Sequence, residues 1–280
     1  MAVSGGDPVG VAVIVPTLDA EATLGACLRS IAQQTEQPAR VMVVDGGSRD
    51  LTVDVARAHG AEVWVCAANR SAQRNLGAHN SKEPLLLFVD ADMRLEPTVL
   101  EACRRAWRVG LSGLVIPEQS FGIGFWARVK ALERSYYQGV WWMEAARFVP
   151  RQAFWDVGGF DPGLVGSEDW DLDERLRQRG PVGRVDALIW HDEGALTLSR
   201  VAAKKRHYAP TLSAYAARHP TRARQQLSPL ARLELLARRP LPLLRAPCEA
   251  LGLLVMATAT WWALRSQTRR DTWAEHEKPR

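Results

Sequence analysis

The sequence has few cysteines, and none of them has the close pairing that a zinc or redox motif requires. The four cysteines lie far apart along the 280 residues, at Cys27, Cys66, Cys103 and Cys248. We therefore expect reduced, mostly packed thiols and a cytosolic domain. The N-terminus also lacks a basic segment followed by a long apolar run. The apolar run that it does contain, at residues 11–15, is too short for a signal peptide. No export of the chain is expected.

The sequence also lacks internal repeats and low-complexity segments. Its 24% charged and 47% hydrophobic residues are typical of a folded protein. A length of 280 residues fits one α/β domain with an appendage better than two equal domains. The formal net charge of +5 favours anionic partners, which include nucleotides, phospholipids and nucleic acids.

Short apolar runs alternate with segments of helical periodicity in the first 195 residues. The first four strands are predicted at residues 11–15, 41–44, 62–66 and 85–89. The helices between them are predicted at residues 21–34, 50–59 and 72–80. Later strands are expected at 114–116, 147–150 and 182–191, with an amphipathic helix at 169–179. This alternation predicts an α/β fold with an open, mostly parallel sheet and helices on both faces.

The composition changes after Gly194, where basic residues become dense and acids rare. We therefore expect an α/β domain at 1–195, a basic helical segment at 196–239 and an apolar helical tail at 240–280. Residues 241–264 carry only Arg245 and Glu249 as charges and end in two tryptophans. Their length and flanking Trp and Arg favour a membrane segment, although prolines interrupt its start. A buried helical hairpin is the alternative.

Polar residues stand where the predicted strands end, at Thr17, Asp19, Asp45, Asp90 and Asp92. Open α/β sheets bind ligands at the carboxyl ends of their strands, so one crevice could collect all five. Taken singly, each could be only a turn or helix-cap residue. Asp90 and Asp92 could face one divalent cation together. Hard oxygen ligands suit Mg²⁺ or Mn²⁺, and such an ion would neutralise a diphosphate leaving group.

Several motifs in this order and spacing resemble the successive signatures of family 2 glycosyltransferases. They are residues 14–17 (IVPT), 43–50 (VVDGGSRD), 73–78 (QRNLGA) and 88–92 (FVDAD). Residues 157–161 (VGGFD) and 167–172 (SEDWDL) resemble the acceptor-side loop and the Glu-Asp catalytic motif of that family. The resemblance covers about residues 11–195. It implies a GT-A fold and transfer of a sugar from a nucleotide-diphosphate sugar to a hydroxyl group, with inversion at the anomeric carbon.

The resemblance also implies roles for individual residues. Asp90 and Asp92 would lie by the donor diphosphate and the metal. Asp169 would be the general base that deprotonates the acceptor hydroxyl, with Glu168 beside it, and the residues alone leave an N-terminal charge cap as the alternative. The residues that would line or flank the nucleotide pocket are Thr17, Asp19, Glu21, Asp45, Arg70, Arg74 and Asn75.

His191 is a further candidate metal ligand, because it ends a predicted strand and GT-A enzymes often place a late histidine on the metal. A structural histidine is the alternative. Two features depart from the family pattern. Gly46 stands where the family often has a second aspartate that can contact the base. The Gln-x-x-Arg-Trp motif of processive synthases has no equivalent at residues 178–180, so we expect transfer of a single sugar.

Two other functional classes are alternatives to a glycosyltransferase. A nucleotidyltransferase would carry a glycine-rich basic phosphate loop after the first strand, where residues 16–19 (PTLD) stand instead. A noncatalytic membrane- or nucleic-acid-binding module is suggested by the basic tail. Arginines beside an apolar run fit anionic lipid headgroups better than a base-reading surface, so we expect a membrane partner and no nucleic acid.

The acceptor is the partner that the sequence determines least. The apolar tail, the basic segment and an aromatic stretch together suggest a lipid or lipid-linked acceptor at the cytoplasmic face of a membrane. Plain core packing of the aromatics is the alternative, and a small hydroxylated natural product also stays open. The aromatic residues concerned are Trp126, Tyr136, Tyr137, Trp141 and Trp142.

Overall fold

The computed structural model describes residues 9–276, with side chains up to residue 264. The ends of the predicted α/β domain and tail, residues 1–8 and 277–280, lie outside this description. The chain divides into two compact units. Among the described residues, the sheet unit comprises 9–117, 145–162 and 172–190, and the helical unit comprises 118–144, 163–171 and 191–276.

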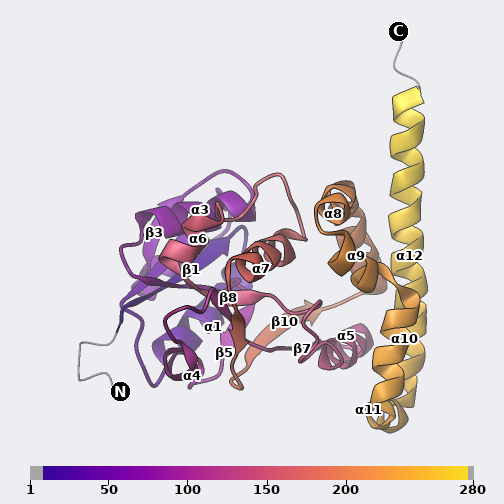
Figure 1. Cartoon of the computed structure of the whole chain (residues 1–280), viewed down its shortest axis with the longest axis horizontal. Coiled ribbons are helices and arrows are strands. Elements are labelled where there is room, and N and C mark those ends of the chain that lie inside the picture. Colours follow the sequence, from indigo (N-terminus) through magenta and orange to yellow (C-terminus); the bar gives the residue numbers. More distant parts are fainter. Residues whose placement is uncertain (1–8, 277–280) are drawn as a thin grey trace. The chain divides into compact units, whose positions relative to one another are not determined.

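The sheet unit is built on seven strands in the order β3-β2-β1-β4-β8-β6-β9, several of which are labelled in Figure 1. The strands are β1 Val11–Thr17, β2 Arg40–Asp45, β3 Glu62–Val65, β4 Leu85–Phe88, β6 Gly113–Val115, β8 Ala146–Pro150 and β9 Val182–Arg184. Strand β1 pairs in parallel with β2 and β4, β2 with β3, and β6 with β9. Only β8 is antiparallel to its neighbours β4 and β6 among these pairs. The predicted mostly parallel sheet is confirmed.

Helices cover both faces of this sheet, which explains why β4 and all of β1 before Thr17 are apolar, and why both strands are buried. Val13 of β1 packs in one core cluster with residues of α1, α2 and α4, and Ile14 packs in a second cluster with residues of α3, α6 and α7. The helices are α1 Glu21–Ala32, α2 Thr52–Ala58, α3 Arg70–Asn80, α4 Val99–Ala106, α6 Arg151–Asp156 and α7 Glu168–Arg179.

The strand expected at residues 182–191 forms as two strands, β9 and β10 Ile189–Ala195. The residues between them bond individually to other segments: the Val185 amide donates to the Val115 carbonyl, and the Leu188 amide donates to the Glu96 carboxylate. A side chain thus replaces a ladder partner at Leu188, which interrupts the extended pairing. Strand β5, Met93–Leu95, also follows the Asp90–Asp92 turn without having been predicted.

The helical unit contains strand β7 Glu118–Ile123 and a series of helices. They are α5 Phe125–Ser135, α8 Leu198–Arg218, α9 Pro220–Leu227, α10 Pro229–Arg238, α11 Pro240–Arg245 and α12 Pro247–His276. Each helix from α9 to α12 begins at a proline, whose missing amide hydrogen costs nothing in the first turn. The prolines therefore divide the predicted basic segment and the predicted tail into separate helices.

Helix α12 packs against α5 and α8 through a small apolar cluster. Its members Leu253 and Met256 contact the same core as Val129 and Val201. Within the described residues, α12 is the one helix that is long and apolar enough to cross a membrane, over Pro247–Leu264. Only 22% of that window is buried, whereas a core helix of a soluble protein is mostly buried.

Candidate functional site

The sheet unit brings the predicted strand-end residues to one edge of the sheet. Thr17 and Asp45 are register partners at the ends of β1 and β2. Asp90 and Asp92 follow β4, the other neighbour of β1, and the Val89 amide still bonds to the Ile14 carbonyl. Glu168, Asp169 and His191 belong to the helical unit.

Asp45 is the most constrained of these side chains. Its carboxylate accepts hydrogen bonds from the amides of Gly47 and Ser48 at 2.8 Å each, from Ser48 Oγ at 2.5 Å and from Thr17 Oγ1 at 3.1 Å. Burial opposes its ionisation, but the hydrogen bonds from Ser48, Gly47 and Thr17 outweigh it and lower the pKa of Asp45. Asp45 is thus an ionised group that shapes the loop at residues 46–48.

Asp19 and Glu21 tie the loop after β1 to the loop after β2. Asp19 Oδ1 accepts from the Arg49 amide at 2.9 Å, while the Asp19 amide donates to Ser48 Oγ at 2.8 Å. Glu21 Oε2 accepts from the Leu51 amide at 2.9 Å. Both side chains are exposed, and Asp19 has a left-handed backbone with φ of 48°. An aspartate tolerates that conformation better than most residues do.

Gly46 leaves space that Gln73 of α3 fills. A Cβ at Gly46 would lie 2.4 Å from Gln73 Nε2 and 3.1 Å from the Thr17 carbonyl oxygen. Gln73 is buried, and its Nε2 donates to that same carbonyl at 3.2 Å. Gln73 was not among the predicted site residues, although its place directly before Arg74 could have indicated it. This contact gives a physical reason for glycine at the position where the family often has a second aspartate.

Helix α3 carries the remaining residues predicted for the donor pocket. Its N-terminus is capped by Asn69, whose Oδ1 accepts from the Ala72 amide, and Arg70 is its first residue. Asn75 exchanges two hydrogen bonds with the backbone of Phe160, at 2.8 and 2.9 Å. Asn75 therefore positions the glycine loop at residues 157–161.

Arg74 forms a buried ion pair with Asp90. Arg74 is fully buried, and its Nη2 lies 2.5 Å from Asp90 Oδ1. Its guanidinium carbon also lies 4.9 Å from the centroid of the Phe160 ring. A second arginine, Arg147 of β8, places Nη2 3.5 Å from Asp90 Oδ2. Sequence reasoning missed Arg147, although an arginine in a buried strand is itself a signal that a carboxylate lies near.

The chemistry of this edge fits a hard divalent cation. Asp90 is engaged by two guanidinium groups, and Asp92 is a second carboxylate at this edge that could serve as a ligand. Within the described part of the chain, no group of three or more acidic, histidine or cysteine side chains could hold a metal. Mg²⁺ and similar ions often use one or two carboxylates and complete their shell with substrate phosphates and water. Burial, reinforced by the charges of Asp92 and Asp90, raises the pKa of the Cys27 thiol, so this thiol stays protonated beside the carboxylates.

In the helical unit, the acidic turn at the start of α7 is held by buried ionic contacts. Asp171 is buried and accepts from His219 Nε2 at 2.8 Å and from Arg218 at 3.3 Å. Glu168 is buried and Asp169 is half-buried within the same turn. Helix α9 adds Arg222, which is buried and donates to backbone carbonyls, among them those of Trp170, Trp142 and Glu144. Sequence reasoning missed these positioning residues because they are more than 45 residues from the turn.

His191 lies on β10, with its Nδ1 3.8 Å from Glu118 Oε2 of β7. A carboxylate on one ring nitrogen is the arrangement that orients a metal-binding histidine, and it equally suits a structural one. Beside it, burial opposes ionisation of Glu193, but the charge of His191, followed by those of Lys130 and Arg134 and a hydrogen bond from Ser120, lowers its pKa.

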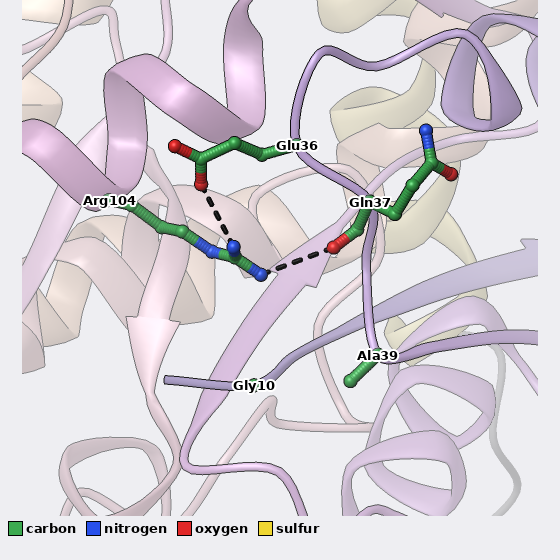
Figure 2. Close-up of a pocket in the computed structure, with 5 residues that line it drawn as sticks. All are labelled: Gly10, Glu36, Gln37, Ala39 and Arg104. Carbon is green, nitrogen blue, oxygen red and sulfur yellow. Dashed lines mark hydrogen bonds and ion pairs between the residues drawn. The ribbon is translucent and has the colours of Figure 1, made fainter. Parts of the chain in front are cut away.

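A pocket elsewhere in the sheet unit does not coincide with these residues. It has a volume of about 550 Å³ and is lined by Gly10, Glu36, Gln37, Ala39 and Arg104. Figure 2 shows the Glu36–Arg104 ion pair across it, at 2.9 Å. Gly10 precedes β1, so this pocket lies at the amino ends of the strands, away from the carboxyl-end residues.

Comparisons with known proteins agree with the fold and the motifs. Residues 12–160 match the model of glycosyl transferase family 2. Validoxylamine A glucosyltransferase of Streptomyces hygroscopicus subsp. limoneus is 25% identical over 226 residues, an alignment that covers 64% of this chain. The chain spans 50% of the length of that relative.

Two solved structures have a similar fold at low sequence identity. The mannosyltransferase PcManGT of Pyrobaculum calidifontis, in complex with GDP-Man and Mn²⁺, has a TM-score of 0.62 and 16% identity, and the match covers 92% of this chain and 86% of that one. Residues 1–349 of TarS from S. aureus, in complex with UDP-GlcNAc, have a TM-score of 0.53 and 17% identity, covering 72% and 66%. The predicted GT-A fold is confirmed, and the chain belongs to glycosyl transferase family 2.

Proposed function

We propose that this protein is an inverting glycosyltransferase that moves a single sugar from a nucleotide-diphosphate sugar to a hydroxyl acceptor. The observation that carries the proposal is the strand-end group of the sheet unit, where the ionised Asp45 loop and the Arg74–Asp90 pair meet the ends of neighbouring strands. Family membership supports the same activity. Two solved structures with a similar fold are complexes with nucleotide sugars.

The sheet unit would bind the donor. Thr17 and Asp45 would line the nucleotide pocket together with the exposed carboxylates of Asp19 and Glu21. Arg70 would contact phosphate, and guanidinium groups suit bidentate phosphate contacts. Arg74 and Asn75 would act mainly by holding Asp90 and the glycine loop, because Arg74 donates to the Asp90 carboxylate and Asn75 donates to the Phe160 carbonyl.

A divalent cation, Mg²⁺ or Mn²⁺, would be held by Asp92 with Asp90 beside it, and His191 is a further candidate ligand. Such an ion would neutralise charge on the departing nucleotide diphosphate. This chain's own residues would orient the donor: the buried Arg74 holds Asp90 in place, and Asp45 fixes the loop that faces the nucleotide.

Asp169 would accept the proton of the acceptor hydroxyl, with Glu168 beside it. A base of this kind must keep a fixed position relative to the reacting hydroxyl. The contacts of Asp171 with His219 and of Arg222 with backbone carbonyls hold the turn that carries Asp169. The side chain of Asp169 is half-buried, which leaves part of it accessible to a substrate.

The helical unit would place the protein at the cytoplasmic face of a membrane. Helices α11 and α12 expose Leu241, Leu244, Leu251, Leu254 and Trp262. Exposed apolar side chains in such number on one segment are typical of a protein or membrane contact. Three arginines line a hollow of about 350 Å³ beside α11. Cations next to an exposed apolar segment favour binding to anionic lipid headgroups.

The activity can be tested with the purified full chain. Incubation with Mn²⁺ and a panel of nucleotide sugars should release a nucleotide diphosphate from at least one of them. Asp169→Asn should abolish transfer while donor binding changes little. Glu174→Gln removes the same charge from the same helix and serves as the matched control. Absence of both release and nucleotide binding across the panel would refute the proposal.

Membrane contact can be tested by flotation with phosphatidylcholine vesicles. Replacing Leu251, Leu254 and Trp262 by serine should move the protein from the vesicle to the soluble fraction. Val109→Ser, at an exposed apolar residue of the sheet unit, is the control and should leave flotation unchanged. Equal flotation of both variants would contradict the membrane assignment.

A further inference from the structure

Five residues of the helical unit form a cluster that the reaction described above does not use. Glu133 lies at its centre: Lys130 Nζ is 2.6 Å from Glu133 Oε2, Arg232 Nη1 is 3.6 Å from Oε1, and the Tyr137 hydroxyl donates to Oε1 at 2.7 Å. Lys205 is the fifth member, close enough to these groups for their charges to affect its ionisation. We call these residues the basic cluster.

The basic cluster holds more positive than negative charge. Burial opposes ionisation of Glu133, but the charges of Lys130 and Arg232 outweigh it and lower its pKa to about 2. Glu133 is therefore a single carboxylate among three cations. The neighbouring carboxylates Glu118 and Glu193 share Arg134, and the charge of Lys130 also acts on Glu193. With these groups included, four cations stand against three carboxylates, so the excess of positive charge is reduced but not removed.

Lys205 shows the excess most clearly. Within the residues that the structure describes, no hydrogen bond or ion pair joins its ammonium group to a carboxylate, whereas Lys130 and Arg232 both contact Glu133. Burial and the charge of Lys130 are the main causes that lower the pKa of Lys205 to about 8, with Arg232 and Lys204 adding to them against Glu133. A cation placed among cations costs free energy unless an anion joins it.

The helices that carry the basic cluster also carry the apolar surface. Lys130 lies on α5 and Lys205 on α8, and α12 packs against both of these helices. Arg232 lies on α10, whose Leu230 and Leu233 are exposed. An anion in the cluster would thus be bound by the same unit that presents exposed leucine and tryptophan side chains. A phosphate group joined to an apolar chain satisfies both features.

We propose that Lys130, Lys205 and Arg232 bind the phosphate group of the acceptor, and that this acceptor is a phosphate-bearing lipid. The site rests on the proposed function in one respect, because only that function makes the ligand an acceptor. Binding itself can be measured without transfer, so the two proposals fail separately.

The experiment compares the binding of the full chain to phosphatidylcholine vesicles with and without phosphatidic acid, which supplies a phosphate monoester. Lys205→Met and Arg232→Gln should each lower the affinity for the phosphatidic acid vesicles about tenfold or more, the loss expected for a charge-assisted hydrogen bond. Binding to phosphatidylcholine alone should not change. Arg206→Gln removes the same charge from an exposed position of α8 and should have a much smaller effect.

Thermal unfolding distinguishes a binding role from a structural one. Lys205→Met should leave Tm unchanged or raise it, because it removes a cation from among cations. A fall in Tm together with unchanged vesicle binding would overturn the proposal, and so would equal losses for Lys205→Met and Arg206→Gln. A further measurement tests inorganic pyrophosphate as a soluble ligand. Saturable binding to pyrophosphate, without preference for phosphatidic acid vesicles over phosphatidylcholine vesicles, would refute the lipid assignment.

Transfer assays on the same samples separate this proposal from the previous one. Release of nucleotide diphosphate from a donor with unselective vesicle binding would refute the phosphate site alone. Selective vesicle binding without any reaction of a donor would refute the glycosyltransferase activity alone.

Discussion

The contact between Gly46 and Gln73 predicts that a methyl group added at Gly46 will destabilise the sheet unit near the carboxyl ends of β1 and β2. In Gly46→Ala, the new Cβ would stand 2.4 Å from Gln73 Nε2. Gln73 is buried and is held by its hydrogen bond to the Thr17 carbonyl, so its amide cannot move away without losing that bond. The same substitution explains why the second aspartate of the family pattern does not fit here.

The magnitude follows from three contributions. Overpacking of a buried site costs about 1–3 kcal/mol, and the lost hydrogen bond of Gln73 costs about 1 kcal/mol. Alanine restricts the unfolded chain more than glycine does, which offsets about 0.4–1 kcal/mol. Gly46 is not among the glycines with positive φ, so backbone strain adds nothing. We therefore expect Gly46→Ala to lower the free energy of unfolding by about 1–3 kcal/mol.

The assay is urea unfolding of the single variants and of Gly46→Ala combined with Gln73→Ala. Because Gln73→Ala removes the obstructing amide, the double variant should be more stable than the sum of the single effects predicts, by about 1 kcal/mol or more. Binding of a nucleotide diphosphate should weaken in Gly46→Ala and recover in the double variant. Additive effects would show that the two residues do not obstruct one another and would refute the argument.

Three further predictions concern buried charges and helix packing. Arg74→Met should lower the free energy of unfolding by about 3 kcal/mol in urea titrations, since it leaves Asp90 buried beside one remaining arginine, and adding Asp90→Asn should recover part of the loss. Burial opposes ionisation of the Glu133 carboxyl, but nearby cations lower its pKa from 4.5 to about 2. Ionised Glu133 should therefore add about 3 kcal/mol to the free energy of unfolding above pH 4.5, and this contribution should be lost as the pH falls toward 2. Acid unfolding of Glu133→Gln should lack this dependence. Gly252→Leu should lower Tm and speed hydrogen exchange in α5, because a Cβ there would lie 2.5 Å from a valine methyl of α5, while Ala257→Leu at an exposed site should not.

Much of the fold follows from local patterns in the sequence. The runs that became β1 and β4 are apolar at every position, which is expected only of strands covered on both faces, and the helices between them have regular apolar spacing. The boundaries differ by a few residues, as at β4, which ends at Phe88. The antiparallel insertion of β8 between β4 and β6 was not predictable, because strand order depends on contacts between distant segments.

The candidate site was predictable only in part, because its contacts also join segments that lie far apart in the sequence. Asp45 and Asp90 stand next to strands and turns, so the sequence alone places them at strand ends. Which groups they contact depends on other elements: Arg147 comes from β8, and Gln73 comes from the middle of α3. The family resemblance implied that Arg74 flanks the nucleotide pocket, and in the structure its fully buried guanidinium is paired with Asp90. A contribution through Asp90 is therefore the role that its geometry supports.

The basic cluster shows how a distribution of charge over several helices can conceal a site. In the sequence, Lys205 belongs to a run of three basic residues that resembles any solvated surface, and Arg232 lies 27 residues further along. Folding places both near Lys130 and Glu133, in surroundings where burial makes the charge of Lys205 costly. An unbalanced cation in such surroundings lowers the stability of the free protein, and binding of an anion would recover that loss. Fluorescence-monitored unfolding should therefore show that phosphatidic acid vesicles raise the Tm of the native chain more than that of Lys205→Met, and an equal rise in both would contradict this coupling between charge and ligand.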